Sequence, residues 1–144
     1  MNYLAYKYKP ELLGADLKAQ ALHDNLYNVL VDLGKKARPH AFQEDHEAKK
    51  PALVEGLRPK LALISKFAGD NTFLTGESIT LADFFAFELF EVFDVIGKEI
   101  LDEYKNLRDF KDRFASQEWY KSYCESDRHI KALFPPQYAK INNV

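Results

Sequence analysis

The side chains with the clearest chemical potential are histidines, carboxylates and one thiol. His40 and His46, with Glu44 and Asp45 between them, are residue types that bind transition metals, but their spacing matches no common ligand pattern. The sequence therefore favours a polar loop over a metal site. Cys124 is the single cysteine, and its amphipathic surroundings offer no His partner. This favours a half-buried structural thiol over a nucleophile and excludes an intramolecular disulfide.

Two further groups of residues have a structural interpretation. His23 and Asp24 lie at positions that the helical spacing assigns to a solvent-facing surface. The aromatic run "FFAFELFEVF" is more typical of core packing than of a cofactor box, because each ring buries on the order of 150–250 Å².

Composition narrows the class of protein. The chain has 144 residues, 47% of them hydrophobic and 29% charged, which is typical of one globular domain. Its acidic and basic residues are interspersed and give a formal charge of −2, so no basic patch indicates nucleic-acid binding. The opening "MNYLAYKYKPELLG" lacks the apolar run of a signal peptide or membrane anchor, so we expect a cytoplasmic protein.

The elements that must position these side chains are all helical. Apolar residues recur at three- and four-residue steps, as in the stripe that runs from Leu17 to Leu33, and no segment alternates like a strand. Pro59 lies inside the third pattern and predicts a kink or a broken turn, while Gly69 marks its end. The residues "RPHAFQED" (38–45) are expected to form a loop. Helices are predicted over residues 1–8, 15–37, 46–69, 80–96, 106–114 and 117–124.

One helix start is unusually well specified. Thr80 is followed three residues later by Asp83, the spacing of a capping box, and Ile79 and Phe84 flank it as a hydrophobic staple. The following run, 81–96, is apolar on nearly every face, so this helix should be the buried centre of an all-α helical bundle.

The sequence around this box resembles the C-terminal helical domain of the cytosolic glutathione S-transferases. "MNYLAYKY" is similar to the helix that closes the N-terminal domain of that family, and "NLRDFKDRF" followed by "SYCESDRHI" is similar to the end of mu-class enzymes. The resemblance runs from Met1 to about Arg128.

The resemblance implies a division of labour between two domains. Residues 1–9 correspond to the end of a thioredoxin-like domain, and residues 10–144 to one helical C-terminal domain. In the family, the thioredoxin-like domain binds glutathione, the co-substrate, and carries the Tyr or Ser that stabilises the thiolate. No such pattern precedes Met1, so we expect no catalytic residue and no cofactor in this chain, and no activity without that half.

The resemblance also assigns binding residues. Asp32 corresponds to the carboxylate that reaches across a dimer to the neighbouring subunit's glutathione, although a solvated helix carboxylate is an equal alternative. Val31 and Lys35 correspond to positions that line the electrophile pocket, where a lysine is unusual. Phe42 stands where the mu class often has a Tyr, and it keeps only apolar contact because it has no hydroxyl.

Two functions follow from these expectations. The first is the helical domain of a dimeric, detoxifying glutathione transferase that supplies the electrophile pocket and dimer contacts. The second is a stand-alone, non-catalytic module for protein interaction. Tyr3, Tyr6 and Tyr8 would expose an apolar face without the missing domain, which predicts a homo-oligomer or a protein partner rather than a membrane or nucleic acid.

Overall fold

The computed structural model describes residues 2–141, and every regular element among them is helical. The predicted all-α fold is therefore confirmed. Residues Phe73 and Gly76 form an isolated β-bridge in the turn before the central helix. The elements are α1 (Asn2–Tyr8), η1 (Pro10–Leu13), α2 (Leu17–Ala37), η2 (Arg38–Phe42), α3 (His46–Ala68), α4 (Leu81–Ile96), α5 (Glu99–Asp102), α6 (Lys105–Ala115) and α7 (Glu118–Cys124).

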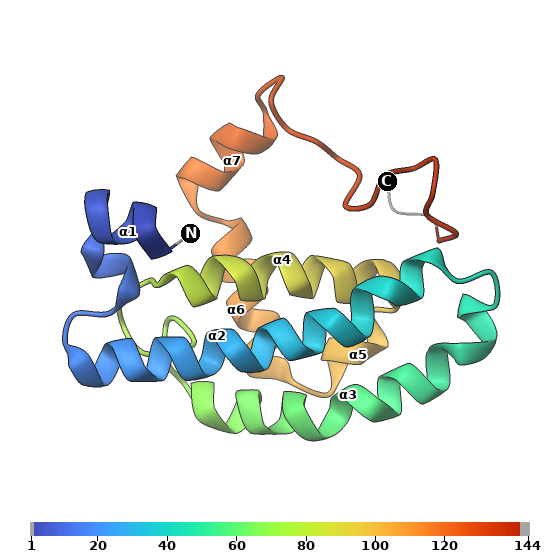
Figure 1. The fold of residues 1–144 in the computed structure, drawn as a ribbon, viewed down its shortest axis with the longest axis horizontal. Helices are drawn as coiled ribbons and strands as arrows, with labels where there is room; N and C mark the ends of the chain where they lie inside the picture. The colour runs from blue at the N-terminus through green and yellow to red at the C-terminus, as the bar shows by residue number, and fades with distance from the viewer. Residues whose placement is uncertain (1, 142–144) are drawn as a thin grey trace.

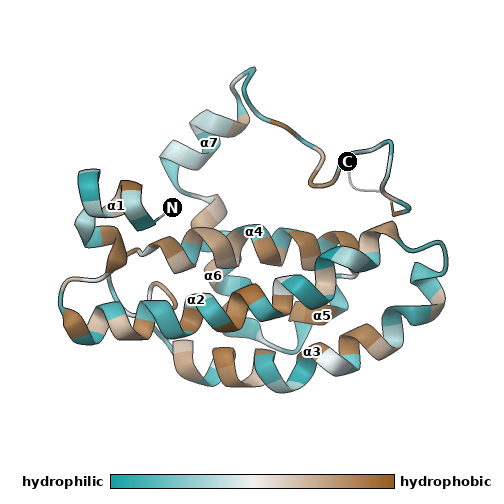
Figure 2. Ribbon diagram, viewed as in Figure 1, coloured by the Kyte–Doolittle hydropathy of each residue, from teal (hydrophilic) through white to brown (hydrophobic). Residues whose placement is uncertain are grey.

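Three long helices form the body of the molecule. Helix α2 lies between α3 and α4 and packs against both, while α6 packs on α3 and α4 (Figure 1). Helix α7 and the chain that follows it lie on the side of α4 remote from α3. Figure 2 shows hydrophobic colour along most of α4, whereas α2 and α3 alternate hydrophobic and hydrophilic residues. Helix α4 is thus the central, buried helix that its composition predicted.

Helix α2 corrects the sequence prediction at two residues. Asp16 caps its start by accepting a hydrogen bond from the Ala19 N–H at 2.8 Å. Leu17, assigned to the apolar stripe, is 84% exposed because it lies in the first turn, at the end of the bundle. His23, assigned to the surface, is only 1% exposed. It lies three residues before the buried Leu26, on the face that α4 covers.

Helix α3 contains two prolines without interruption. Pro59 predicted a kink or a broken turn. The helix is continuous through Pro51 and Pro59, so the turn is not broken, and Figure 1 shows the helix bending about halfway along. A proline removes one backbone donor and crowds the preceding turn, which bends a helix that tertiary packing holds together. Gly69 ends the helix with φ of 53°, as predicted.

The segment predicted as a loop is mostly ordered. Residues 38–42 form η2 and only 43–45 are irregular, and His40 and Ala41 are buried in this turn. The short elements η1 and α5 were also not predicted, because four residues are too few to show a helical period. The predicted stop at Pro10 is confirmed, since α1 ends at Tyr8.

The predicted capping box opens α4. The Thr80 backbone N–H donates to Asp83 Oδ2 at 2.7 Å, and the Thr80 hydroxyl donates to the same oxygen at 2.8 Å. Asp83 Oδ1 accepts from the Leu74 N–H at 2.8 Å. Asp83 therefore caps the helix and also ties it to the preceding turn. The staple stays a prediction: Ile79 is half-buried, while the Phe84 ring lies 5.3 Å from that of Phe114.

The remaining three acidic residues of α4 all have basic partners. Glu88 pairs with Arg38 at 3.0 Å. Glu91 and Asp94 both pair with Lys111, at 2.5 and 2.7 Å. The other faces of α4 are apolar, and these ion pairs lie where its charged side chains emerge from the core. Each of these three acidic side chains is therefore paired with a basic one.

The chain after α7 is irregular, but it is attached to the bundle. Phe134 is buried, and its ring meets that of Phe42 edge-on at 5.5 Å. The Lys140 N–H donates to the Ala41 carbonyl at 2.7 Å. This segment therefore closes over η2 and places an aromatic ring beside the end of α2. Residues 142–144, at the end of the chain, lie outside the described residues.

Candidate functional site

A shallow groove of about 590 Å³ lies where α2 passes into η2 beside α4, and we call it the α2–η2 groove. It contains three of the four predicted binding residues, Val31, Lys35 and Phe42. Phe85 of α4 lies opposite them. The complete lining is Val31, Gly34, Lys35, Arg38, Pro39, Phe42 and Phe85.

Arg38 is the residue of this groove that sequence reasoning missed. Its guanidinium lies 5.1 Å from the Phe85 ring centre and donates to Glu88 Oε1 at 3.0 Å. A Cβ on Gly34 would lie 2.4 Å from Arg38 Nη1, so the glycine leaves the space that the guanidinium occupies. Gly34 and Arg38 are one helical turn apart, and this spacing was the sequence signal that could have identified Arg38 as a groove residue.

Asp32 lies apart from the α2–η2 groove. Its Oδ2 accepts from Lys60 Nζ of α3 at 3.0 Å, and its Oδ1 is 3.9 Å from Lys35 Nζ. The hydrogen bond from Lys60 and the charges of both lysines lower the pKa of the exposed Asp32 carboxyl. The structure therefore places Asp32 on the side of α2 that faces α3.

An apolar groove of about 330 Å³ runs between α2 and α3 on that side, the α2–α3 groove. Lys60, the partner of Asp32, lies at its edge. Leu63 and Phe67 of α3 line it and remain 66% and 42% exposed.

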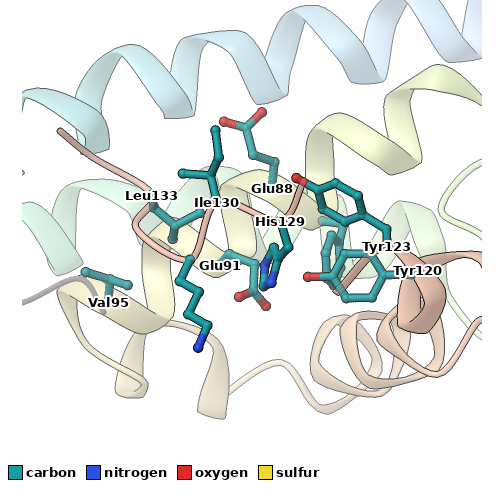
Figure 3. Close-up of a pocket in the computed structure, with 10 residues that line it drawn as sticks. Glu88, Glu91, Val95, Tyr120, Tyr123, His129, Ile130 and Leu133 are labelled. Atoms are coloured by element: carbon teal, nitrogen blue, oxygen red, sulfur yellow. The ribbon is translucent and has the colours of Figure 1, made fainter. Parts of the chain in front are cut away.

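A third groove of about 460 Å³ lies between α4, α7 and the chain that follows α7. Figure 3 shows Tyr120, Tyr123 and His129 on one side and Val95 and Leu133 on the other. The Tyr123 and His129 rings are 5.3 Å apart.

Glu88 and Glu91 also line this third groove, and both already have basic partners. In Figure 3 the Glu88 carboxylate points up, away from His129 and the tyrosines. Glu88, which lines the third groove, forms an ion pair with Arg38, which lines the α2–η2 groove. None of the predicted binding residues lies in the third groove.

The tyrosines of α1 are exposed, as predicted. Tyr3, Tyr6 and Tyr8 each present more than 60% of their surface to solvent. Trp119 and Tyr123 of α7 are also exposed large hydrophobic residues. Both helices flank the same end of α4 in Figure 1.

The other chemical candidates of the sequence do not line these three grooves. The His40 and His46 rings are 6.1 Å apart, and His40 is buried, which lowers the pKa of its imidazole. Within residues 2–141 no group of three His, Cys, Asp or Glu side chains could hold a metal ion. Cys124 is half-buried, as expected. None of the helices in this part of the chain is long and apolar enough to cross a membrane.

Comparison with known proteins identifies the family. A family model described as glutathione S-transferase, C-terminal domain, matches residues 31–127. Glutathione S-transferase Mu 2 of Pongo abelii is 33% identical over 130 residues, which cover 90% of this chain and 59% of the relative. Glutathione S-transferase B of Cavia porcellus is 28% identical over 143 residues, covering 99% of this chain and 65% of the relative.

A solved structure supports the fold. The crystal structure of glutathione S-transferase Blo t 8 matches with a TM-score of 0.81 and 21% identity, over 97% of this chain and 66% of that chain. The chain spans about three fifths of the length of the curated relatives it matches. By the family match and the mu-class similarity, the chain belongs to the glutathione S-transferase family and contains its all-α C-terminal domain.

Proposed function

We propose that this chain is the electrophile-binding half of a glutathione-conjugating enzyme, which acts together with a thioredoxin-like half. The observation that carries the proposal is that Val31, Lys35 and Phe42, which the resemblance assigned to the electrophile pocket, line one groove. Two aromatic rings, Phe42 and Phe85, face this groove and suit a planar apolar substrate.

The exposed aromatic residues of α1 and α7 support a second half docking beside α4. Tyr3, Tyr6 and Trp119 are large aromatic side chains exposed to solvent. Clustered exposed aromatic residues of this kind are typical of a surface that another domain or protein covers. A cytoplasmic, detoxifying role belongs to the same proposal and is supported by the mu-class relatives.

The α2–α3 groove supports dimer contacts. Leu63 and Phe67 form an exposed apolar surface, and Asp32 lies at its rim beside Lys60. On this proposal the partner subunit covers the groove, and Asp32 then faces the partner's glutathione. Replacement Leu63→Glu should convert a dimer into monomers in sedimentation analysis, whereas Lys18→Glu, on an exposed part of α2, should not.

The central test compares this chain with a fusion to the thioredoxin-like half of a mu-class relative. The chain alone should release no heat on titration with glutathione and should not conjugate a chromogenic aromatic electrophile. The fusion should do both. Turnover by the chain alone would overturn the need for a second half.

An inactive but folded fusion would favour the second candidate, a non-catalytic interaction module. The exposed Tyr3, Tyr6 and Tyr8 face of α1 is the observation that supports this alternative. Capture of a stoichiometric protein partner, lost in a variant with these three tyrosines replaced by Ser, would identify such a module.

A further inference from the structure

The α2–η2 groove combines aromatic walls with two basic side chains, Lys35 and Arg38. Its walls, Phe42 and Phe85, are positioned by other rings: Phe134 lies 5.5 Å from Phe42, and Tyr27 lies 5.1 Å from Phe85. Phe42 is nevertheless 41% exposed, so it presents its ring to a ligand.

Lys35 supplies the first charge. Its side chain is 75% exposed, and among residues 2–141 its carboxylate neighbour is Asp32, 3.9 Å away. Asp32 is itself engaged by Lys60 at the shorter distance of 3.0 Å. The ammonium of Lys35 therefore remains available at the rim of the groove.

Arg38 supplies the second charge. Within residues 2–141, only its Nη2 is paired, with Glu88 at 3.0 Å, which leaves the Nη1 and Nε donors of the fork. Gly34 provides the space for Nη1, and Phe85 lies under the guanidinium. The groove lining contains two cations and no carboxylate. A planar guanidinium pairs well with a planar carboxylate.

We propose that this groove selects flat aromatic ligands that carry a carboxylate, with the ring against Phe42 and Phe85 and the carboxylate between Lys35 and Arg38. This inference rests on the proposed function, because it names the substrate class of the same groove. It predicts that the electrophiles conjugated here are anionic aromatic compounds and not neutral hydrocarbons.

The test compares two probes of equal shape, 1-naphthoate and its uncharged amide 1-naphthamide, titrated calorimetrically into the full chain. Naphthoate should bind about fivefold more tightly than the amide, and added salt should reduce this difference. Lys35→Gln should weaken naphthoate binding about two- to fivefold and leave the amide unchanged. Lys18→Gln removes the same charge from an exposed site on the same helix and should change neither affinity.

Backbone amide chemical shifts locate the ligand. Naphthoate should shift resonances of residues 31–42 and of Phe85. Equal affinities for the two probes, no binding of either, an unaffected Lys35→Gln variant, or shifts confined to the α2–α3 groove would each overturn the proposal. The measurement needs neither glutathione nor a second domain, so its failure is distinct from failure of the fusion to turn over.

Discussion

Replacement of Asp83 by Ala should destabilise this domain more than any change to its other carboxylates. Asp83 is 0% exposed, and its two oxygens accept hydrogen bonds from the Leu74 N–H, the Thr80 N–H and the Thr80 hydroxyl. Burial raises the pKa of this carboxyl, because desolvation disfavours its charged form. Part of the free energy of these hydrogen bonds therefore offsets the cost of burying the charge.

The magnitude follows from the groups that lose a partner. The N–H groups of Leu74 and Thr80 are left buried without an acceptor, at about 1–3 kcal/mol each. Replacing Asp83 by Ala also removes the cost of burying its carboxylate, so we expect the free energy of unfolding to fall by about 2–4 kcal/mol in total. For a domain of this size that lowers the melting temperature by about 6–12 °C.

Urea unfolding followed by circular dichroism measures this loss, with Asp112→Ala as the control. Asp112 lies exposed on α6, where its side chain has no bond to the described residues, so its removal should change stability by less than about 0.5 kcal/mol. Asp83→Asn should fall between wild type and Asp83→Ala, because the amide keeps one acceptor. An Asp83→Ala variant as stable as Asp112→Ala would refute the reasoning that these bonds anchor α4.

Three further predictions concern other helices. Gly34→Ala should displace the Arg38 guanidinium and weaken naphthoate binding, while the gain in helix propensity keeps stability within about 1 kcal/mol of wild type; unchanged affinity would contradict this. Burial lowers the pKa of His23 below 6.5, although the Asp24 and Asp83 charges oppose this. As the pH falls, His23 therefore takes up a proton in the unfolded state at a higher pH than in the folded state, so the stability of the fold decreases. His23→Leu removes this histidine and should make urea midpoints less dependent on pH between about 7 and 5. Pro59→Ala should raise the free energy of unfolding by about 1–3 kcal/mol, because it restores a backbone donor inside α3. A loss of stability would instead mean that the bend is needed for packing.

The predictions that succeeded rest on local chemistry. Thr80 and Asp83 are three residues apart, and a capping box needs only that spacing, so the start of α4 was readable before any tertiary contact was known. Gly69 ends α3 for a similar reason, because its positive φ is a property of one residue. The apolar run from Leu81 to Ile96 predicted a buried helix by composition alone.

The predictions that failed depend on which helix covers which face. His23 was assigned to the surface by its helical spacing, but its place three residues before Leu26 and the packing of α4 bury it. Residues 38–42 were expected to be a loop, yet packing turns them into η2 with His40 inside.

The sequence alone determined the helical class, the helix boundaries that caps and glycines specify, and, through resemblance, the residues of a candidate pocket. Only the tertiary structure separated Asp32, beside Lys60, from Val31, Lys35 and Phe42 in the α2–η2 groove. Only the packing of α2 on α4 placed Arg38 over Phe85 and added its charge to that groove. Caps and periodicity act over a few residues of one chain segment, whereas the charge and shape of a pocket depend on side chains that different helices bring together.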